Sequence, residues 1–462
     1  MKPLLNSAIK FVLCSFLIKL VSFSTLLLFI LNYSNLALAG TGTGKYFRVQ
    51  KAADGRWSFV TPEGKPFFSS AIEGVDPEGD TNFIDHKQEY KTNIINKYGS
   101  IESWTSVTLE RIRQWGFNTL GTWSNVSNLE KQLPYTPIMN CSGSIKDEKP
   151  IPDFFSPEFK ANAYAAAESV SRGRTEDSNL IGYFLDNEMH WGVDHRGIQH
   201  AFDVFYSRGA EEPGKVALVS LLKTKYSTIA QLNESWKTSF ASFEDLASNK
   251  KLPIQTLNSE EIWSDRFDFL RLAARQYYST CSQALRSYDP NHLLLGSRLI
   301  SIDTFPEVLE AAAETQDVIS INFYEFVPGV PELIKLFARK LVSPDGFLSH
   351  FYELSGKPLL ISEFGFKAFS FETPSFFPLI FPTSPTQALR ALKIKTYLGH
   401  ISDAKYIIGY QYFKYMDEPS QGRFDGEDSN WGLVNINDEP YSEVVNVFQS
   451  FNRKIQSQAQ LF

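Results

Sequence analysis

Eight short apolar segments recur along this chain of 462 residues, and they constrain its fold more than any other feature. Each is nearly continuously apolar, which is typical of parallel strands covered on both faces. Stretches of helical character at 106–116, 156–172 and 265–289 precede the second, fourth and fifth segments. Eight strand–helix units predict an α/β fold, a (β/α)8 TIM barrel. The segments are Phe67–Ile72, Phe117–Gly121, Tyr135–Asn140, Leu180–Leu185, Leu293–Ser297, Val318–Tyr324, Pro358–Glu363 and Ile407–Phe413.

A doubly wound open sheet is the competing α/β arrangement. It would need an early glycine-rich phosphate turn, and the sequence has neither G-x-G-x-x-G nor G-x-x-x-x-G-K. We therefore assign residues 67–457 to the barrel, with an insertion at about 190–262 in the long interval after the fourth strand. Before the barrel, residues 40–66 combine a Gly/Thr leader with turn dipeptides at Asp54-Gly55 and Glu63-Gly64. These turns predict a short N-terminal β-hairpin that caps the barrel.

The first 39 residues are expected to be a secretory signal peptide. Three lysines precede the 12-residue apolar stretch Leu20–Leu31, and Ala37-Leu38-Ala39 resembles an A-x-A cleavage site. A permanent membrane anchor is the alternative, but 12 residues are fewer than the roughly 20 needed to cross a bilayer. We therefore expect a secreted or periplasmic protein that has no membrane contact after cleavage.

Charge and cysteine content narrow the partners further. Removing the three lysines of the signal changes the net charge from −7 to −10, and no basic run remains. Such a protein is a poor binder of nucleic acid or of anionic lipid. Cys281 lies on the apolar stripe of a predicted helix, which favours a packed thiol. A disulfide between Cys141 and Cys281 stays open, as does the oligomeric state.

The predicted strands end in polar side chains, and in barrels of this class the active site lies at the C-terminal ends of the strands. Strand one ends at Glu73, strand four runs into Glu188 and strand seven ends at Glu363. Glu188 and Glu363, at the ends of strands four and seven, are expected to face each other across the mouth of the barrel. Glycoside hydrolysis requires such a pair of carboxyl groups, one as acid and one as nucleophile. Candidate substrate contacts near the same ends are Asn187, Trp123, Asn140, Trp191, Arg298, Asn322, Tyr324, Gln411 and Trp431.

Several of these segments resemble clan A glycoside hydrolases. The paired motifs are Asn187-Glu188 and "ISEFG" (361–365). The chain is most similar in sequence to family 50 β-agarases, with family 42 β-galactosidase features, in the segments "GFNTLGTWS", "IGYFLDNEMHWG" and "GRFDGEDSNWGLVNINDEPY". The resemblance covers roughly residues 45–455. It implies a retaining enzyme in which Glu188 is the acid/base and Glu363 the nucleophile. It also implies that Asn187 binds the sugar 2-hydroxyl.

The sequence thus predicts an exported retaining β-glycosidase acting on a galactose-containing carbohydrate, without cofactor or catalytic metal. Glu188, His190, Asp194 and His195 lie close together, but their spacing matches no zinc motif. We expect the pKa of Glu188 to be raised by burial and by Glu363. We expect the pKa of Glu363 to be lowered by Arg298. The alternatives are a β-glucanase or β-mannanase of the same clan, and an inactive carbohydrate-binding barrel.

Overall fold

The computed structural model describes residues 44–125, 129, 132–143, 151–192, 199–253, 260–300, 304–324, 344–370, 375, 381 and 383–459. The chain divides after Ala39 into two units, and all the described residues belong to the second, Gly40–Phe462. The predicted signal peptide, residues 1–39, lies outside the described residues. None of the helices in the described part of the chain is long and apolar enough to cross a membrane.

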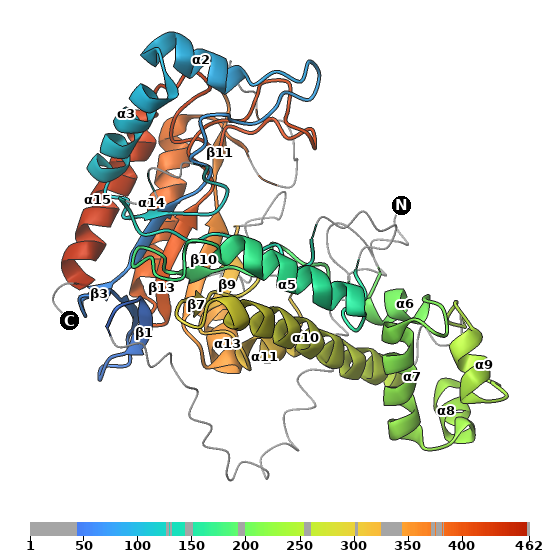
Figure 1. Cartoon of the computed structure of the whole chain (residues 1–462). Coiled ribbons are helices and arrows are strands. Elements are labelled where there is room, and N and C mark those ends of the chain that lie inside the picture. Colours follow the sequence, from blue (N-terminus) through green and yellow to red (C-terminus); the bar gives the residue numbers. More distant parts are fainter. Residues whose placement is uncertain are drawn as a thin grey trace, which may run out of the picture. The chain divides into compact units, whose positions relative to one another are not determined.

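A parallel sheet forms the centre of the second unit (Figure 1). Its strands run in the order β5-β4-β13-β10-β9-β8, and all neighbours pair in parallel. A second parallel pair, β6-β7, joins this sheet because residues 293–300 contain both β7 and β8. The strands are β4 (Ser69–Ile72), β5 (Thr119–Leu120), β6 (Gly182–Tyr183), β7 (Leu293–Leu294), β8 (Leu299–Ile300), β9 (Ile319–Asn322), β10 (Leu359–Phe364) and β13 (Ile407–Tyr412).

The predicted third strand, Tyr135–Asn140, pairs only through isolated parallel bridges. Tyr135 bridges Leu120 and Leu180, and Ile138 bridges Phe184. Proline has no backbone N–H to donate to a ladder, and Pro134 and Pro137 flank Tyr135 and Ile138. These bridges nevertheless connect β5 to β6, so that all eight predicted segments take part in one TIM-barrel-like series of parallel contacts.

The fifth segment is bent between β7 and β8. Gly296 has φ of 89° and Arg298 has φ of 52°, both in the left-handed region. A Cβ at Gly296 would lie 2.8 Å from Ser320 Oγ, so the close approach of the sixth strand requires glycine here. The bend lets residues 293–300 pair with β6 on one side and with β9 on the other.

The helices predicted before strands two, four and five are present. They are α3 (Ile101–Gln114), α5 (Pro157–Ser171) and α10 (Glu260–Tyr288). Ser100 and Ser156 cap the first two by accepting hydrogen bonds from the backbone N–H three residues on. The other described helices outside the insertion are α2 (Glu89–Tyr98), α11 (Pro306–Ala313), α13 (Pro344–Ser355), α14 (Gln387–Asp403) and α15 (Ser442–Ala459), and a short pair of strands is formed by β11 (Lys367–Ala368) and β12 (Thr383–Ser384).

An antiparallel sheet of β1 (Arg48–Lys51), β2 (Trp57–Val60) and β3 (Pro66–Phe67) precedes the barrel. Phe47 and Phe59 are buried with Leu360 and Ile408, which lie near the starts of β10 and β13. The backbone N–H of Trp57 donates to Lys405 O at 2.7 Å. The sheet therefore lies against the end of the barrel where the strands begin.

Among the described residues of the interval predicted as an insertion, four helices lie between β6 and α10: α6 (Ala201–Tyr206), α7 (Pro213–Tyr226), α8 (Ile229–Trp236) and α9 (Phe243–Ser248). They gather near the N-terminal part of α10 (Figure 1). The Asp203 carboxylate accepts hydrogen bonds from Arg266 at 3.2 and 2.9 Å, and the Phe202 ring packs on Phe269. These contacts hold α6 to α10, whose other end leads into β7.

Candidate active site

One amide nitrogen connects the two predicted catalytic carboxylates. Asn322 Nδ2, at the end of β9, donates to Glu188 Oε1 at 2.9 Å and to Glu363 Oε2 at 2.6 Å. The two oxygens share this nitrogen, so they lie no more than 5.5 Å apart, the sum of both distances. The side-chain carbonyl of Asn322, Oδ1, accepts a hydrogen bond from Ser362 Oγ at 2.8 Å. The fold thus brings Glu188 and Glu363 to one place.

Arg298 lies beside this pair, between two buried carboxylates. Its Nη2 is 3.3 Å from Glu363 Oε1, and its Nη1 is 2.7 Å from Glu73 Oε1. Arg298 and Glu73 are both inaccessible to solvent, and Glu363 is 6% exposed. The predicted contact of Arg298 with Glu363 is therefore present, but Glu73 competes for the same guanidinium.

Neutral side chains also take part in the hydrogen bonds around Arg298. Asn187 Oδ1 accepts from Arg298 Nε at 2.6 Å and from Asn322 Nδ2 at 3.1 Å. Gln411 donates to Thr136 Oγ1 at 2.8 Å and accepts from the Thr122 backbone N–H at 3.2 Å. Thr122 also donates its hydroxyl to Glu73. Thr122 was not among the predicted site residues, although it directly follows the second predicted strand.

The electrostatics of Glu363 differ from the expectation. Burial raises the pKa of Glu363 well above its ordinary value, Arg298 opposes the shift, and the negative charges of Glu73 and Glu188 add to it. The prediction that the pKa of Glu363 is held low was wrong, chiefly because Glu363 is buried and also because the charges of Glu73 and Glu188 oppose the effect of Arg298. Burial also raises the pKa of Glu73.

Four of the predicted site residues have a left-handed backbone. Trp123, Asn140, Glu188 and Arg298 have φ between 51° and 62°. Residues other than glycine adopt this conformation rarely, and it costs about 1 kcal/mol or more unless the surroundings support it. All four lie at or beyond predicted strand ends, where the chain leaves the barrel. Such outliers gather at functional sites, which strengthens the choice of this end of the barrel.

The predicted aromatic residues differ in their exposure to solvent. The Trp123 ring is 42% exposed, and together with Asn140 it lines a cavity of about 620 Å³ beside α5. Tyr324 is partly buried, with its ring 6.0 Å from Trp431. Trp431 is itself only 1% exposed and donates from Nε1 to Glu427 at 2.8 Å, so its ring lies behind Tyr324 rather than at the surface of the site. Trp191 is only 3% exposed and packs among Phe154, Tyr277 and Tyr278, so it forms core rather than a wall of the site.

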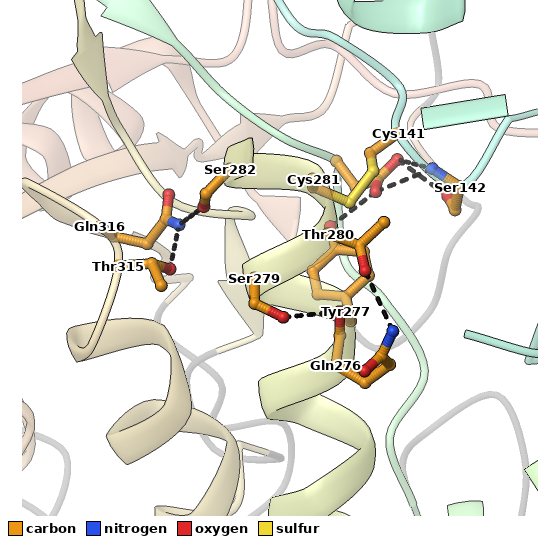
Figure 2. Close-up of a disulfide and its surroundings, with 11 residues drawn as sticks. Cys141, Ser142, Gln276, Tyr277, Ser279, Thr280, Cys281, Ser282, Thr315 and Gln316 are labelled. Carbon is orange, nitrogen blue, oxygen red and sulfur yellow. Dashed lines mark hydrogen bonds between the residues drawn. A yellow bond between two sulfur atoms is a disulfide. The ribbon is translucent and has the colours of Figure 1, made fainter. Parts of the chain in front are cut away.

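A disulfide joins Cys141, after the third predicted strand, to Cys281 on α10, and it settles the question that the sequence left open (Figure 2). Cys281 is buried, as expected, but it is not a free thiol. Next to the disulfide, Asp186 accepts hydrogen bonds from Ser142 Oγ at 2.8 Å and from the Tyr277 hydroxyl at 2.6 Å. Asp186 therefore anchors the segment that leads to Asn187 and Glu188.

The loop after β13 is held by a buried charge network that sequence reasoning did not detect. Arg423 contacts Glu418 at 3.2 Å and Glu427 at 2.5 Å, and Lys414 pairs with Asp80 and with Glu418. Since Glu427 also accepts from Trp431, the network fixes that ring beside Tyr324. Within the described ranges, no group of three or more His, Cys, Asp or Glu side chains could hold a metal ion. Asp194 and His195 lie outside those ranges.

Comparisons with known proteins agree with the resemblance seen in the sequence. A family model described as β-galactosidase matches residues 149–331. Beta-agarase B and Beta-agarase A of Vibrio sp. (strain JT0107) are 29% and 28% identical over 90% and 88% of this chain. The chain spans about half the length of these relatives, 49% and 45%.

Solved structures give the same picture. The crystal structure of an agarase has a TM-score of 0.75 at 28% identity, and that of an exo-β-agarase has 0.77 at 26%. Each comparison covers 90% of this chain and 66% of the other. The predicted resemblance to β-agarases, with features of the β-galactosidase family, is thus confirmed, and with it the TIM-barrel-like fold.

Proposed function

We propose that this protein is an exported retaining β-glycoside hydrolase that cleaves a galactose-containing β-linked polysaccharide or oligosaccharide. Glu188 is the proposed acid/base and Glu363 the proposed nucleophile. The observation that carries the proposal is the shared amide of Asn322, which donates to one oxygen of each carboxylate. An acid and a nucleophile must reach opposite sides of one glycosidic bond, and this contact keeps both groups within reach of it.

The reaction would run as a double displacement. Glu188 donates its proton to the glycosidic oxygen while a Glu363 oxygen attacks the anomeric carbon, so that the leaving sugar departs with its hydroxyl restored. Glu188, now ionised, takes a proton from water, and the resulting hydroxide equivalent releases the sugar from Glu363. Retaining enzymes have carboxyl groups about 5 to 5.5 Å apart, against about 6.5 to 9.5 Å in inverting enzymes. The limit of 5.5 Å between the nearest oxygens supports retention.

The substrate class rests on relatives whose names specify agarase, matched over about nine-tenths of this chain. The exposed Trp123 ring suits a sugar, because the apolar face of a ring stacks on sugar C–H groups. Asn187 is the proposed partner of the 2-hydroxyl, in keeping with its place beside Arg298. Both catalytic roles need only carboxyl groups and protons, so we propose no cofactor.

Export is proposed from the first 39 residues alone, whose charge and apolar pattern match a secretory signal. An inactive carbohydrate-binding barrel is the rival from a different class. The hydrogen-bonded carboxylate pair disfavours it, since a binding protein has no need of an acid and a nucleophile at one place.

The test is an activity screen of the wild-type protein on agarose, porphyran, β-galactosides, β-glucans and β-mannans. Glu188→Gln and Glu363→Gln should each lower turnover by about three orders of magnitude or more with unchanged thermal unfolding. Glu443→Gln, an exposed change on α15, is the control and should keep full activity. NMR of the first product should show the anomeric configuration of the substrate. A variant that retains more than about a tenth of wild-type turnover would remove that glutamate from its role.

A further inference from the structure

We propose that Glu73 is a positioning residue that limits how much of the Arg298 charge reaches Glu363, and so keeps Glu363 basic enough to act as a nucleophile. This inference rests on the proposed function, because it assigns Glu73 a role relative to Glu363.

The geometry favours Glu73 over Glu363 as the partner of Arg298. The Arg298 guanidinium is 2.7 Å from Glu73 Oε1 but 3.3 Å from Glu363 Oε1. Its Nε is already engaged by Asn187 Oδ1 at 2.6 Å. Charge-assisted hydrogen bonds weaken as the distance grows, so the stronger ion pair is the one to Glu73. One positive charge is thus divided unequally between two buried carboxylates.

Glu73 is held in this place by its neighbours. The Thr122 hydroxyl donates to Glu73 Oε1, the oxygen that also binds Arg298. Glu73 Oε2 is buried and has no hydrogen-bond partner in the described part of the chain. A Cβ at Gly121 would lie 2.7 Å from Glu73 Cγ, so the glycine leaves the space that Glu73 occupies. Burying a carboxylate oxygen without a hydrogen bond destabilises the folded protein. Such a cost is expected of a group kept for function rather than for structure.

The other charges around Glu363 define the sign of the effect. Arg298 comes from the bend after β7, Glu73 from the end of β4, Glu188 from the segment after β6, and Arg423 from the loop after β13. The Tyr324 hydroxyl, after β9, is also sensitive to the charge of Glu363. Removing the negative charge of Glu73 eliminates a repulsion and frees Arg298 for Glu363. The pKa of Glu363 should therefore fall.

The kinetic consequence follows from the two steps at Glu363. A more basic carboxylate attacks the anomeric carbon more readily, because nucleophilicity rises with pKa. The acidic limb of kcat/KM reports ionisation of the nucleophile in the free enzyme. If Glu73 sets the basicity of Glu363, removing the charge of Glu73 has to shift the acidic limb of the pH profile of kcat/KM. This holds even though Glu73 does not touch the substrate.

The experiment compares wild type, Glu73→Gln and Thr122→Val by pH profiles of kcat/KM and by NMR titration of 13C-labelled glutamate side chains. Glu73→Gln should shift the acidic limb and the Glu363 titration to lower pH by about one unit, a tenfold change in the ionisation constant. Thr122→Val perturbs the same contact without changing a charge, and its limb should stay in place. Where Glu73→Gln does not fold, Glu73→Asp withdraws the carboxylate and should give a smaller shift in the same direction.

A fall in kcat without any shift of the limb or of the titration would overturn the proposal, because it would leave Glu73 a purely structural role. An unmoved Glu363 titration in Glu73→Gln would do the same. If wild type cleaves none of the carbohydrates, the proposed function fails, while the NMR titration still decides the coupling between Glu73 and Glu363.

Discussion

Removing the Cys141–Cys281 disulfide should destabilise the protein by several kcal/mol. The cross-link joins residues 140 positions apart in the sequence, with Cα atoms 6.0 Å apart. In the chain-entropy description, closing a loop of this length lowers the entropy of the unfolded chain by an amount worth about 5 kcal/mol at 25 °C. The unfolding entropy of a barrel of about 400 residues is about 0.9 kcal/mol/K. Dividing the lost free energy of about 5 kcal/mol by this entropy gives a fall in Tm of about 6 °C.

The assay compares the wild-type protein with Cys141→Ala/Cys281→Ala, each with and without a reductant, by urea unfolding and scanning calorimetry. Both half-cystines are inaccessible in the native structure, so the bond should resist reduction until the chain is partly unfolded. Reductant should lower the stability of the wild type to about that of the double variant, and it should leave the double variant unchanged. Ser142→Ala is a matched control, because it removes a hydrogen bond to Asp186 and keeps the disulfide.

Equal stability of wild type and double variant, or equal stability of oxidised and reduced wild type, would refute this reasoning. The entropy of the unfolded chain would then contribute far less than its loop length implies. Two free thiols per denatured, unreduced chain from Gly40 onward would contradict the disulfide itself.

Three further predictions concern the site and its supports. Burial raises the pKa of Asp186 to about 6, so folding favours its neutral form. As the pH rises from about 4 to 6, the free energy of unfolding of the wild type should fall by up to about 3 kcal/mol relative to that of Asp186→Asn. A difference in urea midpoints that does not change with pH would contradict this. Trp123→Ala should raise KM about tenfold with little change in kcat if the exposed ring binds sugar in ground and transition states alike; steady-state kinetics check this, and a selective loss of kcat would count against it. Dialysis against EDTA should leave turnover unchanged, and activity restored only by an added divalent cation would reopen a metal role for the segment around His190.

Local sequence patterns carried much of the architecture. Short apolar runs, serine caps at Ser100 and Ser156 and the apolar stripe of α10 act through neighbours close in the chain, so each could be interpreted without the fold. The barrel rule then converted strand ends into a candidate site, and Glu188, Glu363 and Asn322 do meet there. Proline at two positions explains why the third strand is weaker than its apolar content indicates.

What only the tertiary structure decided depends on contacts between segments far apart in the chain. Arg298 is shared by Glu73 and Glu363, which are separated from it by 225 and 65 positions. Burial of Glu363, with the charges of Glu73 and Glu188 added to it, reverses the expected pKa shift of Glu363. Trp191 is core and Trp123 is exposed, although both follow predicted strands, because burial depends on which helices pack over each ring. The pairing of Cys141 with Cys281 likewise needed the distance that the fold supplies. A sequence determines which groups a site can contain, but the charges and distances that set their chemistry arise only when distant segments pack together.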